Sequence, residues 1–265
     1  MNELPELLEH VPPLMLVMFR IGGLMIFGPV FGSPVIPVRV KVLLAAMVAL
    51  AIYPLMAADL RLADGMEWHI WLLGPIIALE LMVGLAVGYL ASLPLVSIQM
   101  GGLLMGQQMG LGFATFYNPG IDDEADVVGQ ILFFLALAGF LIIGGHEAMM
   151  MAVLKSFEYI PLGGMQTDFE LVSLITGLLL AAFDLALRVA TPVLALVFLE
   201  SLAMGFVAKT VPQLNILSLG FPLRILAGIM IIMLGLVVIH EVVMDGIAEA
   251  LELIHLWVES QGLKA

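Results

Sequence analysis

The chain has 265 residues, of which 62% are hydrophobic and 12% charged, and its net charge is −13. With a mean hydropathy of +1.15, this composition is typical of polytopic membrane proteins. The few Lys and Arg residues exclude nucleic acid as a partner, and the absence of cysteine excludes disulfides, thiolate metal sites and a cysteine nucleophile.

Windows of about 20 apolar residues mark the expected membrane segments. These segments lie near 11–31, 40–58, 68–98, 127–154, 171–207 and 222–248. Backbone in lipid must satisfy its own hydrogen bonds, and the alternating pattern of a barrel strand is missing, so the sequence predicts an all-α fold. We expect one domain over 1–265, built from hydrophobic helices.

Two of these segments are too long for a single straight crossing. Prolines interrupt both of them, Pro75 and Pro94 in 68–98 and Pro192 in 171–207. The sequence therefore predicts bent helices or helical hairpins there. The N-terminal MNELPELLEH has three glutamates and no Lys or Arg, so we expect the first segment to be retained and not cleaved as a signal.

Lone charges inside the apolar runs need partners, because each costs about 2.5 to 3.5 kcal/mol at the bilayer centre. They are Arg20, Glu80, Asp184, Arg188, Glu200 and Arg224. Asp184 and Arg188 are four residues apart and are expected to pair on one helix face. Two interpretations apply to Glu80 and Glu200: each pairs with a cation on another helix, or each acts as a proton carrier. Pairing is preferred, because a proton relay usually shows several titratable groups along one path.

Three glycines recur every four residues in MGGLLMGQQMGLGF, at Gly102, Gly106 and Gly110. Such small-xxx-small spacing allows membrane helices to approach closely. The stripe is either a packing seam within the chain or a contact with another subunit.

The following stretch, GLGFATFYNPG, gathers Phe113, Phe116 and Tyr117 before an Asn118-Pro119-Gly120 turn. This aromatic loop either packs on its own helices or plugs a pore, since apolar constrictions gate by excluding water.

The sequence offers no catalytic motif. The His-Glu dipeptides at 146–147 and 240–241 do not complete HExxH, because positions 150 and 244 are methionines. No P-loop and no GxSxG motif is found. We therefore expect no metal, no cofactor and no enzymatic activity.

The stretch GFVAKTVPQLNILSLGFPLRILAG, from residue 205, resembles the signature of the flagellar biosynthetic protein FliR family. The matching residues are Pro212, Gln213, Asn215, Gly220, Phe221, Pro222, Leu223, Arg224 and Gly228. Further agreement at Arg20, Gly23 and Pro29, in GQQMGLGFATFYNPG and in FLIIGGHEAMMMAVLKSFEYIPLG extends the resemblance to nearly the whole chain. The chain departs from the pattern at Lys209, where many relatives have arginine, and at Leu217, where an aromatic is frequent.

The resemblance implies a structural and gating subunit of the flagellar type III protein export gate, in the bacterial inner membrane at the flagellar basal body. Its implied partners are the P, Q and B components (FliP, FliQ and FlhB), the A component, membrane lipid and flagellar polypeptides in transit. With P and Q it would form the pore for these unfolded proteins. An R/T-type component of a virulence injectisome is the alternative, although PQLNILSLGFP favours the flagellar branch. A stand-alone proton-coupled transporter ranks third.

By position, the resemblance assigns a pore plug to the loop over 110–120. Its residues are Gly110, Gly112, Phe113, Phe116, Tyr117, Asn118 and Pro119. Polar contacts between helices or subunits are implied for Arg20, Glu80, Asp184, Arg188, Glu200, Lys209, Gln213, Asn215 and Arg224.

Overall fold

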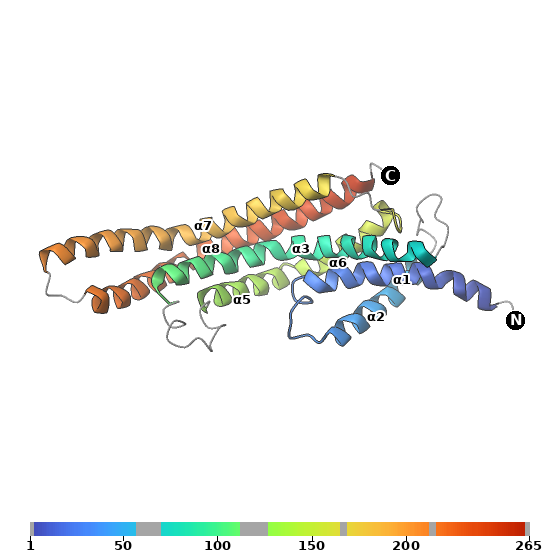
Figure 1. Ribbon diagram of the computed structural model, residues 1–265, viewed down its shortest axis with the longest axis horizontal. Helices are drawn as coiled ribbons and strands as arrows, with labels where there is room; N and C mark the ends of the chain where they lie inside the picture. The colour runs from blue at the N-terminus through green and yellow to red at the C-terminus, as the bar shows by residue number, and fades with distance from the viewer. Residues whose placement is uncertain (1–2, 57–69, 112–126, 165–168, 212–215, 263–265) are drawn as a thin grey trace. The chain divides into compact units, whose positions relative to one another are not determined.

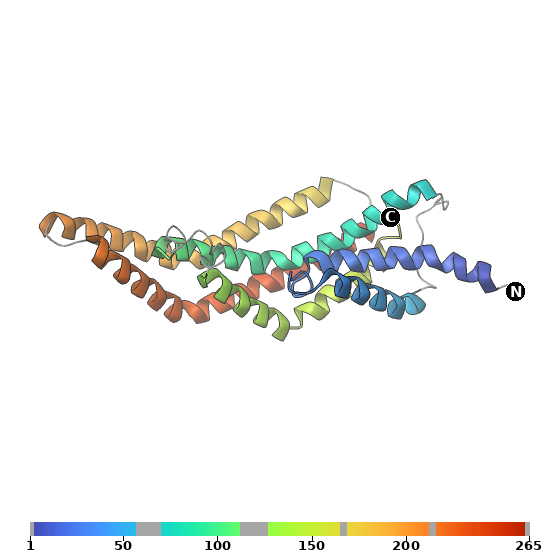
Figure 2. The same ribbon diagram turned by 60° about the horizontal axis from the view of Figure 1, so that its bottom comes forward.

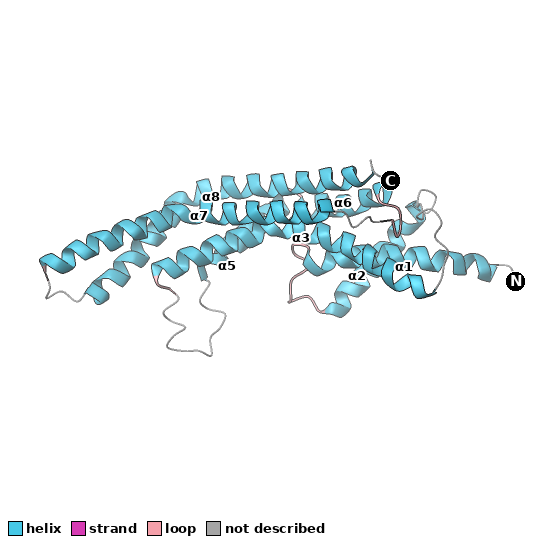
Figure 3. Cartoon of the chain, turned by 45° about the horizontal axis from the view of Figure 1, so that its top comes forward, coloured by secondary structure: helices cyan, strands magenta, loops and turns pink. Residues whose placement is uncertain are grey.

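A computed structural model of the protein describes residues 3–56, 70–111, 127–164, 169–211 and 216–262. Every regular element in these ranges is an α-helix (Figure 3), which confirms the expected all-α fold. In chain order the helices are α1 (Glu3–Phe27), α2 (Val38–Met56), α3 (Ile70–Met109), α5 (Val127–Ile142), α6 (Gly145–Tyr159), α7 (Phe169–Thr210) and α8 (Ile216–Gly262).

The two segments with internal prolines each form one long helix and no hairpin. α3 has 40 residues and contains Pro94, and α7 has 42 residues and contains Pro192. The segment near 127–154, in contrast, is broken between α5 and α6. Gly144 stands at the break with φ 74°, a left-handed conformation that glycine adopts because it lacks a Cβ.

Four of the described helices are long and apolar enough to cross a membrane, or five spans if the broken pair α5 and α6 counts as one. The four stretches are His10–Phe27 in α1, Leu73–Met109 in α3, Ile175–Thr210 in α7 and Ser218–Ser260 in α8. The polytopic membrane class expected from hydropathy is therefore confirmed.

The chain forms two compact units. The first comprises Met1–Leu93, Leu141–Thr176 and Ala248–Ala265. Within it α1 and α2 lie side by side (Figures 1 and 2). Its buried apolar side chains come from α1, α2, α3, α6 and the end of α8, and include Leu16, Leu24, Ala49, Val87, Met149, Phe157 and Ile254.

The second unit comprises Pro94–Phe140 and Gly177–Ile247. It contains the part of α3 from Pro94 onward, nearly all of α5, and most of α7 and α8, which run antiparallel to each other (Figure 1). Its buried apolar side chains include Met105, Met109, Leu132, Phe140, Val189, Val193 and Val243. Many apolar side chains of α7 and α8 point away from this core and are exposed, among them Phe183, Phe198, Phe206, Met230, Met233, Leu234 and Val237.

Candidate functional site: intramembrane charge pairs and the end of α3

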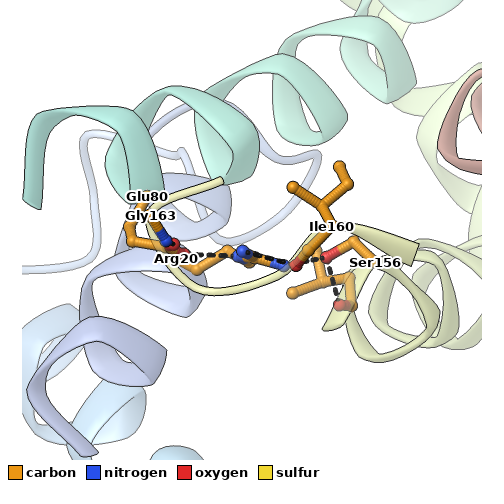
Figure 4. A network of polar contacts seen from close by, with 6 residues as sticks. Arg20, Glu80, Ser156, Ile160 and Gly163 are labelled. Carbon is orange, nitrogen blue, oxygen red and sulfur yellow. Dashed lines mark hydrogen bonds and ion pairs between the residues drawn. The ribbon is translucent and has the colours of Figure 1, made fainter. Parts of the chain in front are cut away.

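A fully buried arginine lies at the centre of the first unit. Arg20 of α1 donates from Nε to Oε2 of Glu80 on α3, at 2.6 Å, and both residues are at most 1% exposed. Its Nη1 donates to Oγ of Ser156 on α6 at 3.0 Å, and its Nη2 donates to the backbone oxygen of Ile160 at 3.2 Å. The guanidinium also lies over the ring of Phe157, with Cζ 4.3 Å from the ring centroid. Figure 4 shows Glu80, Ser156 and Ile160 around the side chain of Arg20.

Glu80 extends this cluster to the turn that follows α6. Its second oxygen, Oε1, accepts a hydrogen bond from the backbone N–H of Gly163 at 2.7 Å. Gly163 has φ 72°, and the N–H of Gly164 donates to the oxygen of Pro161, so the turn requires glycine at position 163. Both oxygens of the carboxylate therefore accept from donors, the arrangement that suits an ionised carboxylate.

Glycines allow α1 and α3 to come close enough for this pair to form. A Cβ on Gly84 would overlap the backbone oxygen of Arg20, and one on Gly23 would overlap the backbone oxygen of Leu81. Gly84 lies four residues after Glu80, and so on the same face of α3. The helix contact and the ion pair therefore depend on one another.

A second charge pair joins α7 and α8 in the second unit. Nε and Nη2 of Arg224 each lie 2.9 Å from Oε2 of Glu200, and Nη2 also donates to Oγ of Ser201 at 3.0 Å. The two charged side chains are 27% and 14% exposed, so the pair is only partly buried. Oε1 of Glu200 is buried and has no hydrogen-bond partner in the part of the chain that the structure describes.

The third pair lies on the surface of α7. Nε of Arg188 is 2.6 Å from Oδ2 of Asp184, one helical turn earlier, and the side chains are 71% and 58% exposed. Beside it α7 and α8 form an apolar cavity of about 180 Å³ lined by Arg188, Val189, Pro192, Ile231, Gly235 and Val238. The sequence predicted the pairing of Asp184 with Arg188 and left the partners of the other four charges open. The structure supplies one from the same chain for each acid and each base.

The three glycines of the predicted stripe have different surroundings. A Cβ on Gly102 would overlap Gly129 of α5, so this glycine permits a close helix contact within the chain. A Cβ on Gly106 would meet Val128 and Leu111 only at ordinary contact distances, 3.8 to 3.9 Å. Gly110 instead ends α3.

The end of α3 is a Schellman motif. Gly110 has φ 86°, its N–H donates to the oxygen of Gln107, and the N–H of Leu111 donates to the oxygen of Gly106. The predicted plug segment begins at this cap. Most of its residues lie outside the described ranges, namely Gly112, Phe113, Phe116, Tyr117, Asn118 and Pro119.

Among the other predicted polar residues, Lys209 is exposed in the last turn of α7. Gln213 and Asn215 lie outside the described ranges. In those ranges, no group of three or more His, Cys, Asp or Glu side chains could hold a metal ion.

Sequence reasoning missed the residues that complete the Arg20 cluster. Ser156, Phe157 and Gly163 carry no charge that would mark them as partners of an arginine. They also lie 136 or more residues from Arg20 in the chain. The only local signal was the Pro-Leu-Gly-Gly turn at 161–164, which indicates a loop but not what it contacts.

Comparison with known proteins gives the context of these pairs. A family model, described as bacterial export proteins, family 1, matches residues 11–250. The chain is 28% identical to the flagellar biosynthetic protein FliR of Bacillus subtilis, over 90% of this chain and 91% of that protein. It is 30% identical to FliR of Escherichia coli, over 80% of this chain and 79% of that protein. It is 25% identical to the secretion system apparatus protein SsaT of Salmonella typhimurium, over 55% of this chain and 56% of that protein.

The matched region contains the whole second unit, most of the first, and all three charge pairs. The relatives are named as flagellar biosynthetic and secretion-apparatus proteins, and none of these names is that of an enzyme. The chain therefore belongs to the bacterial export proteins, family 1, the family of the flagellar biosynthetic protein FliR.

Proposed function

We propose that this protein is a non-enzymatic structural and gating subunit of a flagellar type III protein export gate in the bacterial inner membrane. The observation that carries the proposal is the family match over residues 11–250. The flagellar relatives are similar over 80 to 90% of the chain, whereas the secretion-apparatus relative SsaT is similar over 55%. This difference favours the flagellar branch over a virulence injectisome.

The uncovered apolar surface of α7 and α8 supports membership of a larger assembly. In an apolar 18-residue window of α3, 56% of the residues are buried within the chain, but only 28% are buried in such a window of α7 and 6% in such a window of α8. Large exposed apolar surfaces mark contact with other proteins or with lipid. We assign part of this surface to the P and Q components, with which the chain would form the pore, and other contacts to the B and A components.

The charge pairs support a structural role over a proton carrier. Glu80 has both oxygens occupied by Arg20 and Gly163, and Glu200 is bound by Arg224. A carrier must exchange its proton with water along a path of titratable groups. Glu80 is only 1% exposed, so its carboxylate has almost no contact with water.

The segment after the Gly110 cap is proposed as the pore plug. The Schellman motif ends α3 at a defined residue, so the loop over 110–120 departs from a fixed point. Phe113, Phe116 and Tyr117 would supply the apolar tip that excludes water until a polypeptide passes.

The test is the ion conductance of membranes that contain the assembled complex. Replacing Phe113, Phe116 and Tyr117 by serine should leave the complex assembled but make the membrane leaky, because the constriction loses its apolar surface. The control replaces Phe134 of α5 by serine, because it is exposed but lies outside the surface of α7 and α8 that we assign to other subunits. Unchanged conductance in an assembled triple variant would rule out the plug.

A further inference from the structure

The end of α3 is held against α8 by one methionine. Met109, the last residue of α3, is fully buried. Its side chain covers Gly228 of α8, where an added Cβ would overlap Sδ of Met109. Glycine therefore leaves a hollow on α8, and the unbranched, flexible side chain of methionine fills it. Between residues 218 and 242 of α8, Gly228 is the only buried residue, so Met109 covers the one point at which this part of the helix is fully packed.

This contact lies directly before the cap that ends α3. Gly110 follows Met109 with φ 86°, and the N–H of Leu111 donates to the oxygen of Gly106. The left-handed residue ends the helix at a defined position. A side chain anchored at residue 109 therefore fixes the point from which the loop over 110–120 leaves α3.

The helix that follows the loop is packed on α3 as well. α5 begins at Val127, and its buried Gly129 lies so close to Gly102 of α3 that a Cβ on Gly102 would overlap it. Gly102 lies about two helical turns before Met109. The start of α5 is therefore placed by α3, and the end of α3 is placed by α8. Both ends of the connection are held through contacts that lead to α8.

We propose that Met109 and Gly228 are positioning residues for the gate, because their contact holds the loop over 110–120 in its closed position. The inference rests on the proposed plug, whose aromatic tip excludes water only while the loop is held in place. A change that fills the hollow at Gly228, or one that empties it, should release the loop. A displacement of α8 should move the loop as well, since Met109 is seated on this helix.

The basal ion conductance of membranes that contain the assembled complex tests the contact. Gly228→Ala fills the hollow and should raise the conductance about tenfold, because overpacking by one methyl group shifts a closed–open equilibrium by about that factor. Gly235→Ala is the matched control, in the same helix but with open space around its Cβ position, and should leave the conductance unchanged. Met109→Ala empties the hollow and should also raise the conductance. This variant adds no volume, so it keeps the test available if Gly228→Ala does not assemble.

Combining the two changes separates this contact from general damage to α8. In M109A/G228A the shortened side chain at position 109 no longer meets the added Cβ. The change at position 228 should therefore add no leak to that of Met109→Ala alone. If it raises the conductance by the same factor with methionine and with alanine at position 109, its effect does not pass through Met109 and the proposal is overturned.

A distance measurement distinguishes failure of this contact from failure of the plug. Nitroxides attached to Gln108→Cys and Leu226→Cys, both exposed positions, report the distance between the end of α3 and α8 in a chain without other cysteines. The distance distribution should be narrow in the parent complex and longer or broader in Gly228→Ala. An unchanged distribution overturns the proposal, whatever the conductance. A changed distribution with unchanged conductance would confirm the contact but rule out the loop as the plug.

Discussion

At the scale of single residues, the three charge pairs differ in how completely they are removed from solvent. Arg20 is fully buried, the Arg224 side chain is 27% exposed and that of Arg188 is 71% exposed. Burying an ion pair is favourable only when further hydrogen bonds satisfy the remaining donors and acceptors. Only the Arg20 pair meets this condition fully, with Ser156, Ile160 and Gly163 as additional partners. We therefore expect this pair to be the most sensitive to mutation.

Glu80→Gln should lower the free energy of unfolding by about 3 to 5 kcal/mol, the usual effect of leaving a buried charge without its partner. Glutamine keeps the shape and an accepting oxygen of glutamate. The loss of unfolding free energy therefore measures the contribution of the negative charge. Denaturant unfolding of the purified protein in mild detergent measures it.

Two further variants control for this result. Asp184→Asn breaks an exposed pair and should change the unfolding free energy far less. The double variant R20M/E80L should recover part of the loss, because it removes both charges together. A Glu80→Gln protein as stable as the original would mean that the pair contributes no electrostatic stabilisation.

At the scale of elements, one stripe of α3 positions α1. Glu80, Gly84 and Gly88 recur every four residues, and a Cβ on either glycine would meet the backbone of α1, at Arg20 or at Leu24. Small residues at this spacing let helix backbones approach closely. The glycines thus set the separation at which the carboxylate of Glu80 reaches the guanidinium.

Gly84→Ala should push α1 and α3 apart and weaken the Arg20–Glu80 pair. Alanine favours a helix over glycine by about 1 kcal/mol, so any destabilisation arises from the collision and not from helix propensity. Gly74→Ala, in the same helix but with open space around its Cβ position, is the matched control and should be neutral or stabilising. Thermal unfolding in detergent measures the melting temperatures of both variants. Equal melting temperatures would show that the helices adjust without cost.

Glycine spacing alone did not predict which helix contacts matter. Gly102, Gly106 and Gly110 have the same spacing as Gly84 and Gly88, yet Gly102 faces α5, Gly106 has space around it and Gly110 forms a helix cap. Spacing indicates which residues share a face. What lies opposite that face depends on the fold.

At the scale of the whole molecule, hydropathy was enough to predict the fold class, and the signature that begins at residue 205 was enough to predict the family. The partners of the lone charges were not predictable, except for Asp184 and Arg188, which are neighbours on one helix. Arg20 meets groups 60, 136 and 140 residues away, and no local pattern encodes such contacts. The plug residues after Gly110, together with Gln213 and Asn215, stay predictions.

The uncovered face of α8 provides a test of assembly. Met233 is 71% exposed, so Met233→Trp should not disturb the folded chain. If other subunits pack tightly on this face, the added bulk should remove them from the complex, because packed interfaces tolerate extra volume poorly. Met233→Leu conserves volume and should leave the complex intact. The mass of the complex in mild detergent measures both. A complete complex with tryptophan at this position would indicate that lipid covers the face.

The length of α8 limits how much of it a membrane can surround. The helix has 47 residues, and at about 1.5 Å per residue it is about 70 Å long. A hydrocarbon core about 30 Å thick, crossed at a tilt of about 40°, accommodates only about 40 Å of helix. About 30 Å must then extend beyond the acyl chains, and the mean hydropathy of 2.5 applies to only an 18-residue window of Ser218–Ser260. The rest of α8 lies among headgroups, in water or against protein, so the length of this one helix sets how far the chain extends beyond the acyl chains.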